Sequence, residues 1–382
     1  MANPRDRLDL TDDPLHCIIA RFSIGTQLNT LSLINHQFQD AVHRNMSTMK
    51  TIDVWREMCG QHHIHKAVGN FLRSVSLRCD RITTLNLQYC VVSSSILKTV
   101  ATIPTLAVLV LHHTKGLLPT TIECLGQLEH LCSLNLSRCG WLDDTTLKPI
   151  AKLKHLTRLN VAHCYKVTNA GLMHIRGLTQ LTHLDLNGCY KIQDDGLVHL
   201  INLTKLTSLR LKSCENISDA GMQHVGNLTQ LVSLDIGECD EITDAGLKHI
   251  TLLENLIQLY MGRCSRITDE GMSCLSQLPN LEYLDLSHSV LSDTRLQHLG
   301  RLTRLTALIL GDCANATDNG LRCIARLTRL RHLLISKLSL MGDDGTKTIY
   351  TSVCLQQLRD GLAARNLFGA DASPRRATTT SV

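Results

Sequence analysis

The sequence predicts an α/β solenoid, in which short parallel strands and short helices alternate along one axis. Three observations carry this prediction: a repeat of 25 residues, two leucines spaced two residues apart in each repeat, and a cysteine at a fixed place in it. The segment LTRLNVAHCYKVTNAGLMHI begins at Leu156, and LTHLDLNGCYKIQDDGLVHL begins at Leu181. A unit this short cannot bury its apolar face alone, so it must stack against its neighbours.

Each repeat is expected to contain one strand followed by a turn. In Leu184-Asp185-Leu186 the two leucines point to one side and Asp185 to the other, because successive strand residues alternate. Cys189 then turns the chain inward, where a buried thiol acts as a small apolar residue with a weak hydrogen-bonding group. Strands of this kind are expected around one leucine in each repeat: Leu85, Leu109, Leu134, Leu159, Leu184, Leu209, Leu234, Leu259, Leu284, Leu308 and Leu333.

A short helix is expected after each strand. Leu247 and Ile250, three residues apart, form the apolar stripe that faces the core. The helix starts carry side-chain oxygens that can accept hydrogen bonds from free backbone N–H groups, as in Ser218-Asp219, Thr243-Asp244 and Thr268-Asp269. Stacking such units gives a horseshoe with parallel strands on the concave side and short helices on the convex side.

The pattern L-x-x-L-x-L-x-x-C, repeated every 24 or 25 residues, resembles the leucine-rich repeat. Its 25-residue form is similar to the cysteine-containing subclass, in which Cys replaces the Asn of other leucine-rich repeats. Repeats of this subclass are often attached to F-boxes.

Residues 10–42 read as two or three short helices ahead of the solenoid. Leu15, Ile18, Ile19 and Phe22 make one apolar stripe, and Pro14 lies near the first turn, where a missing N–H costs least. By composition alone, this is a small helical unit packed before the repeats.

The order of residues in this segment resembles an F-box. Leu10 stands at the opening Leu, two Asp follow at the acidic positions, and 18–22 supplies the first helix core. The second helix matches at Leu28, Leu31 and Phe38. Thr11 departs from the family, which has Pro there. The resemblance implies binding to a Skp-type adaptor, within a cullin complex, through one set of side chains: Leu10, Pro14, Leu15, Ile18, Ile19, Phe22, Leu28 and Leu31.

The expected organisation has five parts. They are a loose N-terminus (1–9), an F-box-like helical unit (10–60), the leucine-rich-repeat solenoid (61–345), a C-terminal capping helix (346–368) and a disordered tail (369–382). The capping helix would cover the open end of the solenoid.

The composition of the chain limits the classes of partner that we expect it to bind. The net charge is only +5 and no long run of Lys or Arg occurs, which argues against a nucleic-acid partner. No apolar stretch of about 20 residues or N-terminal signal is present, so we expect no membrane partner. Of sixteen Cys, half lie in the repeat column and none forms a C-x-x-C pair. We therefore expect free thiols, no zinc ribbon, and a cytoplasmic or nuclear location.

No catalytic motif is found: there is no G-x-S-x-G, H-E-x-x-H or G-x-x-x-x-G-K-S/T. We expect no enzyme activity, cofactor or metal. One column on the helices invites a metal or pH-sensing alternative: His174, His199, His224, His249 and His298, with Cys124, Cys274 and Cys323. The simpler interpretation is a consensus position of the repeat, partly exposed between helices.

The concave face is the candidate binding site, because side chains flanking the inward leucines are not needed by the core. The expected substrate-binding residues are Arg138, Arg158, Asn160, His163, His183, Asp185, Arg210, Lys212, Asp235, Glu238, Tyr260, Arg263, Tyr283, Asp285 and His288. Such a mosaic of charges, with Arg and Tyr, suits a specific protein partner better than a polyanion. The alternative is a solvated inner face that binds nothing.

Together these patterns predict a substrate-recognition subunit of an SCF-type E3 ubiquitin ligase. The F-box-like helices would bind the adaptor, and the concave face would hold a protein substrate. The alternative is a leucine-rich-repeat interaction scaffold without a ligase role, in which residues 10–60 only cap the first repeat.

Overall fold

The structure is a computed structural model of the 382-residue chain. It describes residues 50–53, 81–311, 313–334, 339–341 and 347–349. The chain divides into two compact units, Met1–Trp141 and Leu142–Val382. The N-terminus 1–9, the tail 369–382 and the adaptor-binding side chains from Leu10 to Leu31 lie outside the described residues, so those predictions stay predictions.

The described part of Met1–Trp141 contains short parallel strands joined by helices. The strands pair in one register and are β1 (Thr51–Asp53), β2 (Thr84–Asn86), β3 (Val108–Val110) and β4 (Ser133–Asn135). The helix α6 (Ser94–Val100) follows β2, and the 3₁₀ helix η2 (Pro119–Gln127) follows β3. The middle residue of each strand is at most 1% exposed and lies in the core.

The prediction that 10–60 is helical is wrong at β1, which pairs in parallel with β2. Within the residues that the structure describes, the sheet therefore starts at Thr51, ahead of the expected boundary at residue 61. The strand escaped prediction because its segment carries Ile52 where the later repeats have the first leucine of their Leu-x-Leu pair.

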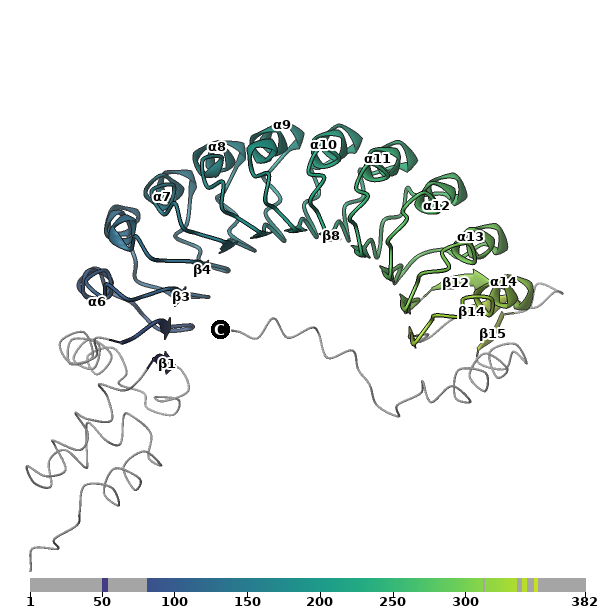
Figure 1. Ribbon diagram of the computed structural model, residues 1–382, viewed down its shortest axis with the longest axis horizontal. Helices are drawn as coiled ribbons and strands as arrows, with labels where there is room; N and C mark the ends of the chain where they lie inside the picture. The colour runs from purple at the N-terminus through teal and green to yellow at the C-terminus, as the bar shows by residue number, and fades with distance from the viewer. Residues whose placement is uncertain (1–49, 54–80, 312, 335–338, 342–346, 350–382) are drawn as a thin grey trace, which may run out of the picture. The chain divides into compact units, whose positions relative to one another are not determined.

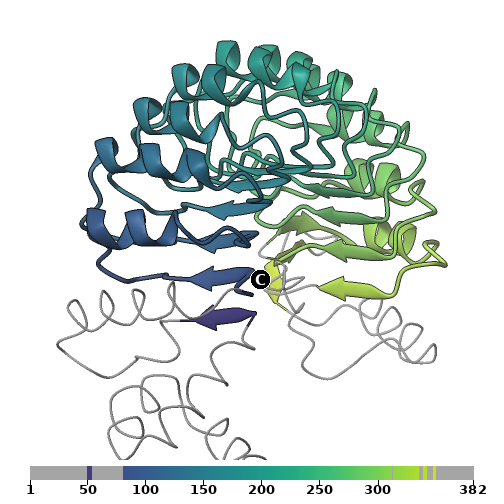
Figure 2. The same cartoon turned by 60° about the vertical axis from the view of Figure 1, so that its left-hand side comes forward.

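The unit Leu142–Val382 repeats the same arrangement. Its parallel strands are β5 (Arg158–Asn160), β6 (His183–Asp185), β7 (Ser208–Arg210), β8 (Ser233–Asp235), β9 (Gln258–Tyr260), β10 (Tyr283–Asp285), β11 (Ala307–Ile309) and β13 (His332–Leu334). Figure 2 shows these strands running in the same direction, as their pairing requires. Every leucine expected to mark a strand is the middle residue of one, so the predicted strands are confirmed.

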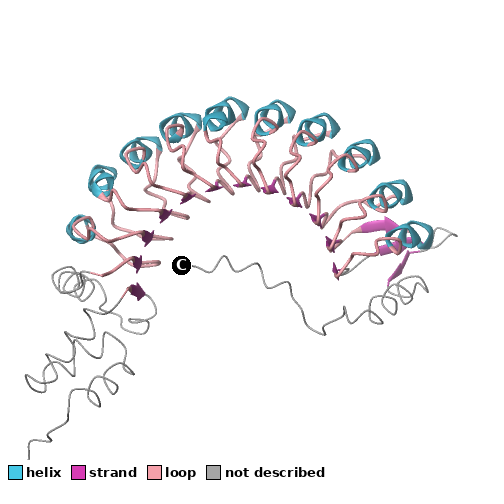
Figure 3. Cartoon of the chain, in the orientation of Figure 1, coloured by secondary structure: helices cyan, strands magenta, loops and turns pink. Residues whose placement is uncertain are grey.

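The helices of this unit lie on the outer side of the arc of strands (Figure 1 and Figure 3). They are α7 (Asp144–Ile150), α8 (Asn169–Ile175), α9 (Asp194–Leu197), the 3₁₀ helix η3 (Val198–Asn202), α10 (Asp219–Val225), α11 (Asp244–Ile250), α12 (Asp269–Leu275), α13 (Asp293–Leu299) and α14 (Asp318–Ile324). Leu247 and Ile250, the predicted inner stripe of α11, are fully buried. The predicted α/β solenoid, with strands inside and helices outside, is confirmed.

The residues that were predicted to cap the helices also link neighbouring repeats. Thr243 caps α11, since its hydroxyl accepts from the N–H of Ala245 at 3.2 Å. The carboxylate of Asp219, at the start of the preceding helix, accepts from the N–H of Thr243 at 2.8 Å and from its hydroxyl at 2.6 Å. The same carboxylate accepts from the N–H of Gly246 at 2.9 Å. Each first-turn Asp therefore joins its repeat to the next.

The same interaction recurs along the unit. Carboxylates at the equivalent position bind the next helix cap at distances of 2.6 to 3.3 Å. In helices α8 to α12 and α14 the third residue is Gly, which leaves room for the side chain of the first residue of the preceding helix. A Cβ on Gly246 would lie 2.5 Å from Oδ1 of Asp219.

Arg295 departs from this pattern, because it stands where helices α8 to α12 and α14 have Gly. Its side chain is buried and donates to Asp269 at 3.3 Å, to the carbonyl of Ile267 at 2.6 Å and to the carbonyl of Val290. Its repeat also lacks the column cysteine, with Ser289 in its place. The guanidinium is thus held by one carboxylate at the start of helix α12 and by two loop carbonyls.

A second small sheet closes the described part of this unit. It contains β12 (Ala314–Ala316), β14 (Ser339–Met341) and β15 (Lys347–Ile349), and β14 and β15 are antiparallel. The prediction of a helix over 346–368 is wrong at 347–349. The rest of that segment lies outside the described residues.

Candidate functional site

The candidate site is built on the side of the strands opposite the buried leucines. Each strand of β5–β10 has the form x-Leu-x, and the two flanking residues project together because strand residues alternate. In β6, for example, Leu184 is 1% exposed, whereas His183 and Asp185 are part-exposed. We call this side of β5–β10 the concave face.

The Asn and Asp side chains of this face also hold the fold. The residue that ends the strand accepts a hydrogen bond from the backbone N–H two residues further on, which stabilises the turn. The bonds are Asn160 to Ala162 at 2.9 Å, Asp185 to Asn187 at 3.1 Å, Asp235 to Gly237 at 3.1 Å and Asp285 to Ser287 at 2.9 Å. One side-chain oxygen of each of these residues is therefore already bonded within the fold. The expectation that these side chains are free for a partner is wrong for that oxygen.

A further set of predicted site residues lies in the turn rather than on the strand. They share the position before the column cysteine, or its equivalent, and a left-handed backbone: Arg138, His163, Glu238, Arg263 and His288, with φ between 57° and 61°. Non-Gly residues rarely adopt this conformation. The sequence signal for it is Gly188, which stands at the same position with φ of 68°.

Opposite charges compensate each other at the middle of the concave face. Arg210 lies 3.6 Å from Asp185, and Lys212 lies 3.3 Å from Glu238. Glu238 also accepts from the hydroxyl of Ser213 at 2.6 Å. The hydrogen bond from Ser213 and the nearby Lys212 lower the pKa of Glu238, so this carboxylate stays ionised.

Burial acts in the other direction on the strand carboxylates. It raises the pKa of Asp235 to about 6, against the lowering effect of the Gly237 N–H and of Lys212. Burial also raises the pKa of Asp185. Asp235 therefore loses its charge as the pH falls through about 6.

Aromatic side chains follow this charged centre. The rings of Tyr260 and Tyr283 lie 4.7 Å apart between centroids. Burial raises the pKa of both phenols, so they remain protonated hydrogen-bond donors at neutral pH. Arg158 and Arg263 are exposed, and neither has an ion-pair partner among the described residues. Paired aromatic rings near exposed Arg are the side chains that anchor protein interfaces.

Two basic residues of the predicted site, His183 and Arg138, differ from the exposed arginines of the concave face. His183 bonds through Nδ1 to the hydroxyl of Thr182 at 2.8 Å, and burial together with Arg158 and Arg210 lowers its pKa. His183 is therefore neutral at pH 7. Arg138 belongs to the other unit, Met1–Trp141, where its side chain is exposed.

That unit carries a cluster that the sequence analysis missed. His112 contacts the hydroxyl of Ser137 at 2.6 Å and the ring of Tyr89 at 5.1 Å between centroids. His113 lies 5.5 Å from Tyr89. The sequence pattern could have indicated this cluster. Tyr89 stands directly before a column cysteine, and His113 stands directly before the equivalent position of its own repeat.

The column cysteines are buried and form no disulfide among the described residues. Cys239 donates from Sγ to the carbonyl of Leu211, in the preceding repeat, at 3.2 Å. Cys189, Cys214 and Cys264 make the equivalent bond at 3.2 to 3.3 Å. Burial raises the pKa of the Cys189 and Cys264 thiols to about 12, so these groups are not nucleophiles.

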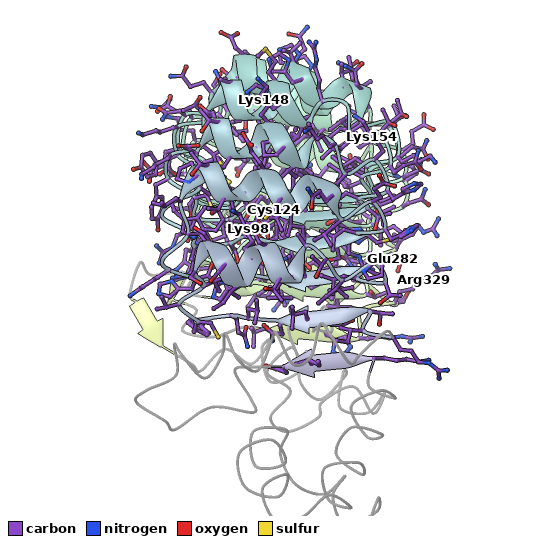
Figure 4. All side chains as sticks on the ribbon, turned by 90° about the vertical axis from the view of Figure 1, so that its left-hand side faces the viewer. Lys98, Cys124, Lys148, Lys154, Glu282 and Arg329 are labelled. Carbon is purple, nitrogen blue, oxygen red and sulfur yellow. The ribbon has the colours of Figure 1, made fainter. Side chains whose placement is uncertain are left out.

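The histidine and cysteine column lies on the helices, as expected. Cys124 and Lys98 lie close to one another on the helical side of Met1–Trp141 (Figure 4), and burial raises the pKa of Cys124. Within the described residues, no group of three or more His, Cys, Asp or Glu side chains is arranged to hold a metal ion. Nor does any described helix have the length and apolar character needed to cross a membrane.

Comparison with known families gives one match: residues 61–322 fit the model of a leucine-rich repeat region. A comparison with curated proteins gives no match. Among solved structures, an internalin (inlF) from Listeria monocytogenes is 26% identical with a TM-score of 0.54, and the likeness covers 70% of this chain and 72% of the internalin.

Two further structures are less similar. The internalin C2 (inlC2) of the same bacterium is 25% identical over 52% of this chain and 84% of its own, with a TM-score of 0.37. The TLR13–ssRNA13 complex is 22% identical over 69% of this chain and 40% of its own, with a TM-score of 0.47. That protein is solved with RNA, and the expectation that the present chain binds no nucleic acid stays a prediction.

Proposed function

Because the chain belongs to the leucine-rich-repeat family, we propose that it acts as a protein-binding scaffold whose concave face over β5–β10 holds the partner. The family consists of interaction and receptor proteins, so the chain itself is not an enzyme. The observation that carries the proposal is the Tyr260–Tyr283 pair on strands β9 and β10, with its rings 4.7 Å apart.

The arrangement of charge supports a protein partner on this face. Its centre is internally compensated by the Arg210–Asp185 and Lys212–Glu238 pairs, and unpaired Arg158 stands at one end. On a surface where positive and negative side chains alternate, a partner is selected by the order of its charges rather than by its total charge. A polyanion would instead be repelled by Asp185, Asp235 and Glu238.

We further propose that the scaffold is the substrate-recognition subunit of an SCF-type E3 ubiquitin ligase. The support is the resemblance of residues 10–42 to an F-box, followed by cysteine-containing repeats in the order found in such subunits. The N-terminal side chains would bind a Skp-type adaptor within the cullin complex. The concave face would hold a protein substrate, and the chain would contribute proximity rather than bond chemistry.

Co-purification of the full chain with a Skp-type adaptor tests the ligase role. The double variant Leu15→Asp plus Ile19→Asp places charges in the predicted adaptor-binding stripe and should abolish binding. The matched control is Leu118→Asp plus Leu252→Asp, because these leucines are already 61% and 57% exposed. Loss of binding in the first variant alone, with unchanged circular dichroism, is the expected result.

The alternative is a scaffold without a ligase role. It predicts that the intact, folded chain recovers no adaptor. It also predicts that removing residues 1–49, which keeps strand β1, makes the solenoid aggregate, because a cap that covers the first repeat would be lost. A location in the cytoplasm or nucleus is part of the ligase proposal, and microscopy of the tagged chain tests it.

A further inference from the structure

A second surface lies on the loops that follow two neighbouring strands, separate from the Tyr260–Tyr283 pair. Tyr165 and Tyr190 come directly after column cysteines 164 and 189, one repeat apart. Their rings are stacked, with centroids 5.4 Å apart and planes 25° apart. Both remain exposed, at 48% and 41%. We call Tyr165, Lys166, Tyr190 and Lys191 the loop patch.

The loop patch is positively charged. Lys166 and Lys191 follow the two tyrosines, are exposed, and have no acidic partner among the described residues. Equivalent residues of adjacent repeats lie about 5 Å apart where the strands pair. The two lysines therefore lie on adjacent loops, and each follows directly after one tyrosine of the stack.

The equivalent loops further along the unit differ, which shows that this pattern is not a requirement of the repeat. There, Arg266 lies 2.7 Å from Glu241, and Ser265 donates to Asp240 at 3.2 Å. Those loops satisfy their charges internally. The loop patch leaves both of its charges for something outside the described chain.

The backbone beneath the loop patch is fixed. Lys166 forms a parallel bridge with Asp143, and the N–H of Val167 donates to the carbonyl of Cys164 at 3.0 Å. The carbonyl of Tyr190 accepts from the side chain of Asn216 in the next repeat. The side chains are thus presented on a rigid support, which lowers the entropy lost when a partner binds.

We propose that the loop patch binds a short acidic segment of a partner protein that also carries an aromatic or large apolar side chain. The segment's carboxylates would meet Lys166 and Lys191, and its apolar side chain would pack on the Tyr165–Tyr190 stack. Single-stranded nucleic acid fits less well. The two rings already stack on each other, His163 packs edge-on against Tyr165 at 6.2 Å, and exposed Glu215 and Asp240 follow on the next loops.

Titration of the full chain with defined synthetic probes tests this assignment. The probe is a fluorescent peptide in which one Phe is flanked by Asp and Glu. Its control replaces every Asp and Glu with Asn and Gln. The acidic peptide should bind at least about tenfold more tightly than the neutral one, and added salt should weaken it. Absence of binding, or equal binding of the two peptides, overturns the proposal.

Charge reversal locates the site. Lys166→Glu plus Lys191→Glu should weaken the acidic peptide by about tenfold or more. The matched control, Lys148→Glu plus Lys152→Glu, reverses two exposed lysines in and next to helix α7 and should leave binding unchanged. Equal loss in both variants would mean that only net charge matters and would contradict the proposal.

Two further arms complete the test. Tyr165→Ala plus Tyr190→Ala should weaken the acidic peptide while leaving the circular dichroism spectrum unchanged. An oligothymidine strand should compete poorly with the peptide. Tighter binding of the oligonucleotide, lost in the lysine variant, would reassign the loop patch to nucleic acid and overturn the inference. None of these arms involves the concave face or an adaptor, so their outcome is independent of the ligase proposal.

Discussion

The carboxylate of Asp219 accepts two hydrogen bonds from Thr243, one from its N–H at 2.8 Å and one from its hydroxyl at 2.6 Å. These residues are 24 positions apart and belong to successive helices. Thr243 in turn caps its own helix through Ala245. Each repeat thus helps to start the helix of the next, which couples the helical sides of neighbours whose strands also pair.

Removing this carboxylate should destabilise the chain. Asp219→Ala leaves the N–H groups of Thr243 and Gly246 without their acceptor, and we expect a loss of about 2 kcal/mol in the free energy of unfolding. Urea denaturation followed by circular dichroism measures it. Asp195→Ala removes an exposed carboxylate with no partner among the described residues, so it should change stability by less than about 0.5 kcal/mol. Equal effects of the two variants would refute the coupling.

Gly246→Ala should also destabilise, although alanine favours a helix over glycine by about 1 kcal/mol. The new Cβ would lie 2.5 Å from Oδ1 of Asp219. We expect a net cost of about 1–3 kcal/mol in urea denaturation. Gly140→Ala is the control, because its Cβ would have nothing within 4 Å. In an Asp219→Ala background the cost of Gly246→Ala should shrink, and a cost that stays the same would argue against this contact.

Replacing Arg295 tests the buried side chain that helix α13 has in place of the glycine of its neighbours. Arg295→Met removes hydrogen bonds to Asp269 and to the carbonyls of Ile267 and Val290. Because the guanidinium is buried, we expect a loss of about 2–4 kcal/mol in thermal or urea denaturation. Arg301→Met, at an exposed position, should cost far less. A small loss for Arg295→Met would mean that water replaces the side chain.

Asp235→Asn should change how stability depends on pH. Burial raises the pKa of Asp235 to about 6 in the folded chain, whereas an unfolded Asp titrates near 4. The folded chain therefore binds an extra proton between about pH 4 and 6, and this group's contribution to stability increases as the pH falls through that window. Above pH 6 the ionised carboxylate costs up to about 3 kcal/mol.

The amide of Asp235→Asn can still accept from the Gly237 N–H, which bonds Asp235 at 3.1 Å. We expect this variant to be more stable than the natural chain at pH 7.5, with the gain disappearing near pH 4. Urea denaturation across this range measures the difference. A gain that is independent of pH would show that the carboxylate is not the cause.

The repeat itself could be predicted from the sequence. Every strand that was predicted around Leu184 and its equivalents is present in the structure. The leucines of one repeat are two residues apart and the repeat recurs every 25 residues, so only one arrangement buries all of them. Thr243 was identified as a helix start for a similar local reason. The strand β1 was missed because Ile52 stands in a segment without the Leu-x-Leu pair.

Contacts between repeats could not be predicted in this way. The bond from Thr243 to Asp219 depends on the offset between stacked helices, which the sequence period does not specify. Likewise, Asp185 and Asp235 alternate outward as expected, but their bonds to the following turn depend on the turn conformation. The ring stack of Tyr165 and Tyr190 was visible only as a repeated Tyr-Lys pair.

Site-specific photocrosslinking tests the central claim most directly, namely that the concave face over β5–β10 holds a protein partner. A benzophenone amino acid would replace Tyr260 on that face in one variant and Met173, 42% exposed on helix α8, in another. Irradiation in cells should attach the same protein to position 260 across replicates, and not to position 173. A partner attached at 173 and not at 260, or no protein attached at 260, would contradict the account.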